Sequence, residues 1–302
     1  MIRMCMLILC VWIQGSFLCS QEVASQAESV SLSGYTLEGH KKWDLLAQSA
    51  EILPGADNIN LENPKGILYD NGDPEVYLNS KTGVYNPKTG NILLEENVIM
   101  EAVTGAKVET SKLVWDSETV ILEMENDIKM IKDNALLTGK GMKVFKDKHL
   151  AILKHNAKLK VFNESLNVHP SVITCTGEME VNYQENFVEF HDNVVISNSQ
   201  VNLKADYMKV FIDRKSKKLD KVVCKGDVLI VQDTKRALCG QAEYDALEGY
   251  ILLTENPRIF RDGNILTAEM ITFYLEDERV ICKPSAQLLL FISDEDREFF
   301  EL

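Results

Sequence analysis

The side chains of this 302-residue chain that could perform chemistry are its carboxylates and histidines. A pair of carboxylates facing each other on neighbouring strands could act as acid and nucleophile in the hydrolysis of a polysaccharide. Most carboxylates stand at predicted turns, as Glu95, Glu96, Asp127, Asp192 and Asp227 do, where a side chain is expected to face solvent. The histidines lack the spacing of metal ligands, and the sequence has no Gly-x-Ser-x-Gly element. We therefore predict no catalytic residue, no metal site and no cofactor.

Cysteines are the other reactive side chains, and three of the seven lie in the first twenty residues. The remaining four all lie in the C-terminal half: Cys175, Cys224, Cys239 and Cys282. In an oxidising compartment an even set of this kind could form disulfides. Small buried apolar residues of a sheet fit these positions equally well. The sequence alone leaves both interpretations open.

Residues 1–20 have the basic, apolar and exit regions of a secretory signal peptide, in that order. A basic start at Arg3 is followed by an apolar run from Met4 to Ile13, by Gln14-Gly-Ser, and by a small residue at the exit, Ser20. Three fates fit this segment, which are cleavage, retention as a membrane anchor, or lipidation of Cys19. All three place the body of the chain outside the cytoplasm. We interpret the polar residues 21–34 as a linker.

The formal charge of −14 at pH 7 excludes one class of partner. Binding to nucleic acid needs a clustered basic surface that displaces counterions. The nearest basic cluster, residues 214–218, reads as a short solvated loop between apolar strands. We therefore predict no nucleic-acid partner.

The elements that must position any site are short strands that recur about every thirty residues. Each unit is an alternating apolar strand, a turn containing Asn or Asp, and a second apolar alternation. The residues that leave these turns are Val98, Ile128, Val194, Val228 and Ile259. A fixed period of this size is typical of stacked architectures, in which each unit buries its apolar face against its neighbours. We therefore predict an all-β stack rather than a compact enzyme domain.

The inward apolar residues of this stack are the candidates for a binding surface. Alternation points one face of every strand inward, and stacking joins these faces into a long interior that is open at its ends. An interior of this kind could carry acyl chains, but a dry core needs the same residue types. The candidates for a lipid-binding groove are Leu94, Val98, Met100, Trp115, Leu122, Met179, Val181, Tyr183, Phe190, Val194, Ile196, Tyr244, Leu253, Ile259 and Tyr274.

The last apolar segment is expected to end the stack. An unprotected apolar edge invites another chain to add a strand. We therefore predict an edge strand for partner binding, formed by Leu288, Leu289, Leu290, Phe291 and Ile292.

Several sequence segments of these units, taken in order, resemble proteins of lipopolysaccharide transport. The first half resembles the periplasmic component C (LptC), and the second half resembles component A (LptA), the OstA-like periplasmic bridge. The phrases for component C are residues 43–47, 77–86, 91–98 and 113–116, and those for component A are residues 187–194, 203–208, 240–245, 251–259 and 268–274. Two features depart from the family. Glu96, Asp192 and Glu255 replace a glycine before the turn asparagine, and both components occur in one chain.

The resemblance implies two tandem OstA-like twisted β-jelly rolls, at residues 35–165 and 166–302, stacked into one elongated open groove. It further implies a periplasmic carrier that holds the acyl chains of lipopolysaccharide. Its partners would be an inner-membrane lipopolysaccharide-export ATPase complex and an outer-membrane translocon, joined by edge-strand pairing, with head-to-tail self-association as a further expectation. Two other classes remain open, a structural envelope scaffold without lipid and a polysaccharide-active β-helix enzyme of the periplasm.

Overall fold

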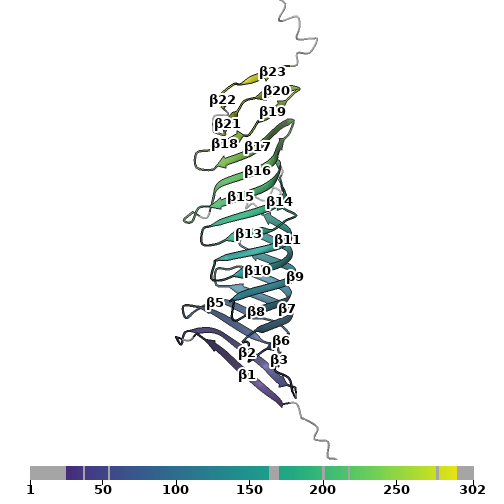
Figure 1. Ribbon diagram of the computed structural model, residues 1–302, viewed down its shortest axis with the longest axis vertical. Coiled ribbons are helices and arrows are strands. Elements are labelled where there is room, and N and C mark those ends of the chain that lie inside the picture. The colour runs from purple at the N-terminus through teal and green to yellow at the C-terminus, as the bar shows by residue number, and fades with distance from the viewer. Residues whose placement is uncertain are drawn as a thin grey trace, which may run out of the picture.

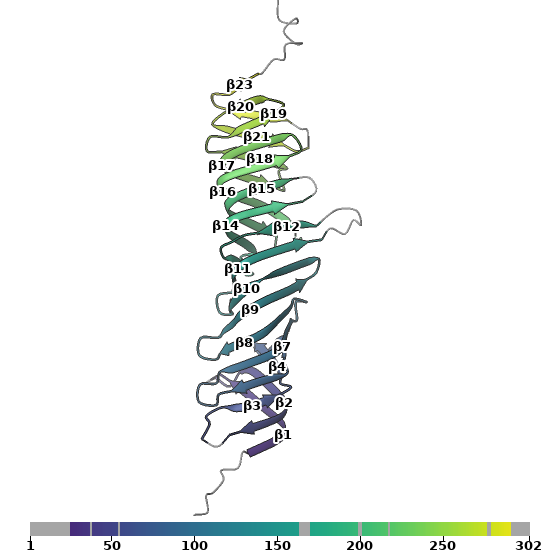
Figure 2. The ribbon, with the colours of Figure 1, turned by 90° about the vertical axis from the view of Figure 1, so that its right-hand side faces the viewer.

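The computed structural model describes residues 25–290, except residues 37, 54, 163–169, 199–200, 217 and 277–278. Over these residues the chain forms 23 antiparallel strands hydrogen-bonded into one continuous sheet, and it contains no helix. The strands stack along one long axis, from β1 at one end to β23 at the other (Figures 1 and 2). The predicted all-β fold is confirmed.

The strand bounds show that long strands alternate with groups of short ones. They are β1 Ser25–Tyr35, β2 Lys41–Ile52, β3 Ile59–Glu62, β4 Lys65–Asp70, β5 Asp73–Asn79, β6 Thr82–Tyr85, β7 Ile92–Ala102, β8 Lys107–Asp116, β9 Ile121–Lys132, β10 Ala135–Phe145, β11 Leu150–Val161, β12 Ser171–Thr174, β13 Met179–Asn182, β14 Phe187–Ser197, β15 Asn202–Ile212, β16 Leu219–Gln232, β17 Lys235–Asp245, β18 Tyr250–Thr254, β19 Arg258–Arg261, β20 Asn264–Thr267, β21 Met270–Tyr274, β22 Val280–Lys283 and β23 Gln287–Leu289.

The predicted Asn/Asp turns are bends inside long strands, not reversals of the chain. In β7, Glu96 and Asn97 have φ angles of 60° and 56°, and the pairing with β8 shifts register there. The half of β7 before the bend pairs with β6, and the half after it pairs with β5. The same left-handed pair recurs at Asp192–Asn193 in β14 and at Glu255–Asn256 between β18 and β19. Asparagine and aspartate tolerate this conformation because their short side chains can hydrogen-bond locally.

The bends divide the structure into two facing layers. We call the layer that contains β4, β5, β12, β19, β20 and β23 sheet 1, and the layer that contains β3, β6, β13, β18, β21 and β22 sheet 2. Each long strand from β7 to β17 contributes one half to each sheet. The bends form one closed side of the stack. The strand ends and their loops lie on the opposite side, which we call the open side.

Three expectations about segment boundaries need correction or fall outside the described residues. Residues 25–34 do not form a linker, because β1 pairs with β2 along its whole length. The last strand ends at Leu289, so Leu290 lies beyond it, and Phe291 and Ile292 lie outside the described residues. The signal segment, residues 1–20, also lies outside them.

The expected boundary between residues 165 and 166 falls in residues 163–169, which are not described. The sheet continues on both sides of that position, because β11 pairs with both β12 and β13. The two jelly rolls therefore share one interior.

Candidate functional site

The inner face of sheet 2 carries an unbroken apolar row along the whole stack. Each residue of this row is paired with the next one on the neighbouring strand. We call it the sheet 2 track, and it consists of Tyr85, Ile92, Trp115, Leu122, Val144, Ala151, Val181, Val188, Val210, Val222, Tyr244, Ile251, Phe273 and Val280. Neighbouring strands lie about 4.8 Å apart, so successive residues of the row follow one another at about this distance.

Sheet 1 carries a matching row, which packs against the same hydrophobic core. We call it the sheet 1 track, and it consists of Leu78, Met100, Val108, Met130, Leu137, Leu159, Ile173, Ile196, Leu203, Ile230, Ala237, Ile259, Leu266 and Leu288. The two tracks are thus parallel apolar linings of one interior.

A deeper layer lies between the tracks and the bends, and it is fully packed. Its members include Leu113, Met124, Leu153, Phe190 and Met208, all exposed by 2% or less. Burial of this extent supplies the main stabilisation of the stack, since each large apolar side chain taken out of water contributes about 1.5–3 kcal/mol. This layer is core, and it separates the tracks from the closed side.

The tracks end in a cavity of about 810 Å³ at the C-terminal end of the stack. Its apolar wall is formed by the last residues of both tracks, among them Ile259, Leu266 and Phe273, together with Leu288 and Leu290. Its polar rim includes Lys235, Arg261 and Asp262. The interior is therefore open to solvent at the end where a further strand could add to β23.

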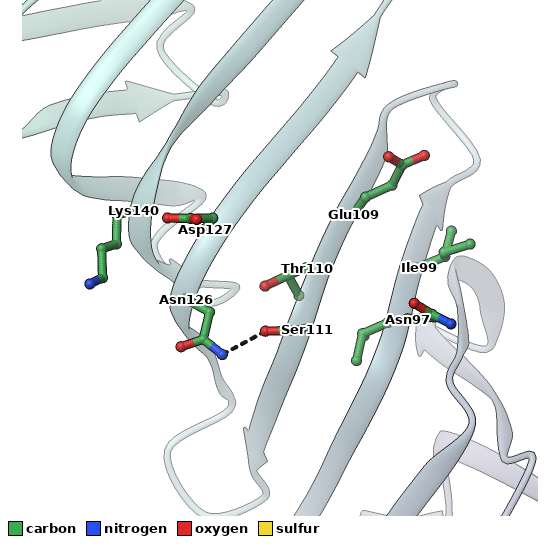
Figure 3. Close-up of a pocket in the computed structure, with 9 residues that line it drawn as sticks. Asn97, Ile99, Glu109, Thr110, Ser111, Asn126, Asp127 and Lys140 are labelled. Atoms are coloured by element: carbon green, nitrogen blue, oxygen red, sulfur yellow. Dashed lines mark hydrogen bonds between the residues drawn. The ribbon is translucent and has the colours of Figure 1, made fainter.

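A second depression, of about 790 Å³, lies at the bends of β7 to β10, and most of the residues that line it are polar (Figure 3). Strands β8 and β9 are not paired with each other over residues 110–113 and 124–128. Asn126 Nδ2 donates a hydrogen bond of 2.6 Å to Ser111 Oγ there. Lys129 hydrogen-bonds the carboxylate of Glu109 and lowers its pKa. This depression opens on the closed side and contacts neither track, so it is not the apolar site.

The sequence-predicted groove residues fall into three places in the structure. Met100, Ile196 and Ile259 lie in the sheet 1 track, and Trp115, Leu122, Val181 and Tyr244 lie in the sheet 2 track. Leu94, Met179, Phe190 and Leu253 belong to the buried layer, and Val98 and Val194 lie just after the bends. All but four of these thirteen residues are exposed by 8% or less, and their role as a lipid-binding groove stays a prediction.

Two of the predicted groove residues are placed differently. Tyr274 alternates with the inner-face residues Ile271 and Phe273 on β21 and contacts Tyr250 and Arg279, and it also lines the C-terminal cavity. Tyr183 follows the end of β13, is 43% exposed, and packs its ring on His149. Burial, and then the charge of Glu75, raises the pKa of Tyr183. The prediction took the wrong phase of the alternation at Tyr274, which is still paired with Tyr250, whereas Tyr183 lies beyond the end of its strand.

The four described cysteines are free thiols, so the disulfide interpretation is not supported. Cys175, Cys224 and Cys239 are buried in the core, where Cys224 pairs with Ala242 and Cys239 with Val228. Burial raises the pKa of Cys224 to about 12 and that of Cys239 to about 11. They act as small apolar core residues, which was the alternative interpretation.

Sequence reasoning missed most of both tracks. The missed members include Val210, Val222, Leu159, Ile173 and Leu203, which lie in plainly alternating strands. The alternation would have identified them, but only strand register shows that they continue one row. Over the described residues no cluster of potential metal ligands occurs, and no helix there has the length and apolarity to cross a membrane.

Comparison with known families gives an identity to this architecture. Residues 5–161 match the family model of LptC-related lipopolysaccharide-assembly proteins, which covers more than half of the chain. The chain belongs to the LptC-related family. Residues 176–279 of this LptC-related chain match a second model, that of the LptA/LptD N-terminal-domain lipopolysaccharide transport proteins. The order of the two matches confirms the resemblance seen in the sequence, and the chain is a lipopolysaccharide-transport protein.

Among the solved structures that are similar to the LptC-related chain is one periplasmic transport component. It is LptH, the LptA-homologous periplasmic component of the lipopolysaccharide transport device of Pseudomonas aeruginosa. The match has 13% identity and a TM-score of 0.37, and it covers 41% of this chain and 96% of that structure. No curated protein matches the chain.

Proposed function

We propose that the chain carries the acyl chains of lipopolysaccharide between its two apolar tracks and passes them along the stack without catalysing a reaction. The observation that carries this proposal is the continuity of both tracks, which run from β6 and β5 to β22 and β23 and end at the open cavity. An acyl chain needs continuous apolar cover because each methylene group exposed to water costs about 0.8 kcal/mol. A row of similar residues provides that cover without one tight site that would trap the cargo.

The ends of the stack support a role as a bridge between partners. Strand β1 pairs with β2 on one side, and β23 pairs with β20 on one side, which leaves an edge at each end of the described chain. Exposed apolar side chains gather at the C-terminal edge, where Leu288, Leu289 and Leu290 are 60%, 56% and 56% exposed. Exposed edges of this kind pair with strands of other proteins. In this proposal the inner-membrane export complex binds at the β1 end, which follows residues 1–20, and the outer-membrane translocon binds at the β23 end.

The cellular location follows from the same proposal. A bridge of this kind works in the periplasm, and residues 1–20 would then direct export or hold the β1 end at the inner membrane. The family membership supports the periplasmic location, and an anchored N-terminus would place β1 next to the export complex.

Photocrosslinking of lipid along the stack tests the carrier function. A photoreactive residue at Leu203, in the sheet 1 track, is expected to crosslink to lipopolysaccharide in the periplasm of a producing cell. The same residue at Lys204, the next position on β15 and on its outer face, is the matched control and should give little crosslinking. Equal crosslinking at the two positions would contradict binding between the tracks.

A scaffold without lipid is the second candidate, because the layer beneath the tracks is fully packed and needs no ligand to be stable. It predicts a folded protein that takes up no lipopolysaccharide at either position, so the same experiment decides between the two functions.

A further inference from the structure

Five of the described loops at the sheet 2 ends of the open side share one capping pattern, and the loop after β10 departs from it. At the ends of β6, β8, β13, β15 and β17, an Asn or Asp side chain accepts hydrogen bonds from the backbone N–H groups two and three residues later. These residues are Asn86, Asp116, Asn182, Asp213 and Asp245. At the end of β10 the corresponding residue is Phe145, which pairs with Leu150 as Asp116 pairs with Ile121 and has no side-chain acceptor; Lys146 follows it.

Lys146 instead reaches a distant part of the chain. Its Nζ lies 2.6 Å from Glu75 Oε2, donates a 2.7 Å hydrogen bond to the carbonyl oxygen of Tyr69, and lies 3.8 Å from Asp70 Oδ1. The side chain is only 20% exposed. Three acceptors around one half-buried ammonium group fix it far better than a single surface ion pair would.

These contacts join the two sheets across the open side. Tyr69, Asp70 and Glu75 belong to the β4–β5 hairpin of sheet 1, whereas Lys146 follows the sheet 2 half of β10. The hairpin is itself held to sheet 1, because Val103 N donates a 3.0 Å hydrogen bond to the carbonyl oxygen of Glu75. We call the Lys146 contacts with this hairpin the clasp.

Burial of the tracks changes at the clasp. On its N-terminal side most track residues are buried, as Met100, Val108, Trp115 and Leu122 show with exposures of 8% or less, whereas Tyr85 and Met130 are partly buried. Beyond β11 the members of both tracks, such as Val188 and Leu203, are only partly buried. The interior is therefore closed on the side in the LptC-like half and accessible in the LptA-like half.

We propose that Lys146 is a positioning residue that closes the open side of the LptC-like half, so that lipid enters this half from its end and not from the side. This inference rests on the proposed function and adds where the cargo path is open. The clasp makes the N-terminal half a closed conduit and leaves side access to the C-terminal half.

The test measures lipid access on both sides of the clasp in the full-length chain. A benzoylphenylalanine photocrosslinker replaces Trp115 on the closed side or Tyr244 on the accessible side, and purified lipopolysaccharide is added without partner proteins. In the otherwise unchanged chain, crosslinking is expected at position 244 and is expected to be several-fold weaker at position 115. Lys146→Met should raise crosslinking at position 115 several-fold and leave position 244 unchanged.

Two further variants separate the clasp from general loosening of the fold. Lys148→Met lies in the same loop, where Lys148 Nζ sits over the ring of Phe145, and it should behave as the unchanged chain does. Lys146→Arg keeps the positive charge and the hydrogen-bond donors that Tyr69, Asp70 and Glu75 need, and it should leave crosslinking at position 115 at its low value. Circular dichroism and thermal unfolding confirm that each variant is folded.

The outcomes distinguish the two levels of the proposal. Suppose that position 244 crosslinks and that Lys146→Met does not change the signal at position 115. This result overturns the clasp and leaves the carrier function standing. A high signal at 115 before any substitution, or a raised signal at 115 in Lys146→Arg, also overturns it. The absence of crosslinking at both positions in every variant overturns the carrier function itself.

Discussion

At the residue scale, the structure uses polar side chains to fasten strands at the rim of an apolar interior. Asp44 on β2 is the clearest case, because it accepts hydrogen bonds from Ser33 Oγ at 2.6 Å, Tyr69 Oη at 2.7 Å and Lys41 Nζ at 2.9 Å. It thereby ties β1 and β4 to β2. These bonds, that of Ser33 first, lower the pKa of Asp44 from 3.8 to about 2.

A depressed carboxyl pKa makes a prediction about pH. The ionised carboxylate stabilises the folded state at every pH above its ordinary pKa of 3.8, and this contribution is lost as the pH falls towards 2. We expect Asp44→Asn to lower the free energy of unfolding at pH 7 by about 1 kcal/mol. The difference from the unchanged chain should shrink as the pH falls from 3.8 to about 2.

Urea unfolding at several pH values measures this difference. Asp220→Asn, at an exposed position of β16, is the control and should show no such difference. A difference for Asp44→Asn that persists unchanged at low pH would show that shape, and not charge, holds β1 in place.

At the element scale, the bend in each long strand decides that one strand serves two sheets. The bend depends on consecutive left-handed residues such as Glu96 and Asn97 in β7. A bulky or branched residue is strained in this conformation, whereas glycine is not. The turn chemistry that the sequence analysis recognised is therefore present, but it bends a strand and does not reverse it.

Substitution at a bend tests this interpretation. Asn97→Val should lower the free energy of unfolding by about 1–2 kcal/mol, because a β-branched residue at positive φ is strained. Asn97→Gly should retain the stability of the unchanged chain within about 0.5 kcal/mol. Denaturant unfolding monitored by circular dichroism gives both values, and equal stability of the two variants would contradict a left-handed bend.

The last described strand makes a second prediction at this scale. Proline at Leu288 removes a backbone N–H and restricts the backbone of β23, so it should abolish assembly with a partner or with a second copy at this end. Leu288→Ala keeps the N–H group and should assemble. Size-exclusion chromatography and crosslinking compare the two variants, and normal assembly of Leu288→Pro would exclude edge pairing through β23.

At the scale of the whole molecule, two transport families share one continuous interior. The matches to the LptC-related model and to the LptA/LptD N-terminal model meet around β11 and β12, where the sheet is unbroken. A chain with this architecture joins within one polypeptide what would otherwise need an interface between two proteins. Both tracks cross this junction without an interruption.

Continuity of the tracks predicts that one polar residue can block transport. Val188 lies in the sheet 2 track near the middle of the stack and is partly buried, so an aspartate there places a charge in the cargo path. In cells, Val188→Asp should retain lipid crosslinking at position 115 and should lose it at position 244. Glu189→Gln, on the outer face of the same strand, is the control. Loss of crosslinking at both positions would indicate general unfolding, and retention at both would contradict movement along the track.

The sequence by itself determined the class of fold, the period of the stack and which way most apolar side chains point. These properties are local, because alternation over a few residues decides which face of a strand avoids water. It also supplied the family, since the phrases around Trp43, Trp115 and Tyr244 recur in a fixed order. The buried state of Cys224 and Cys239 was one of two interpretations that local sequence could not separate.

Only the tertiary structure decided which residues join into a track, which belong to the packed layer, and where the open side is closed. Strand register sets these properties, and register depends on pairing between segments that the local pattern does not specify. The pairing of residues 25–34 with β2 and the position of Tyr274 have the same cause. Lys146 shows it most plainly, because its partners are a hairpin about seventy residues earlier in the chain, and only folding brings the two together.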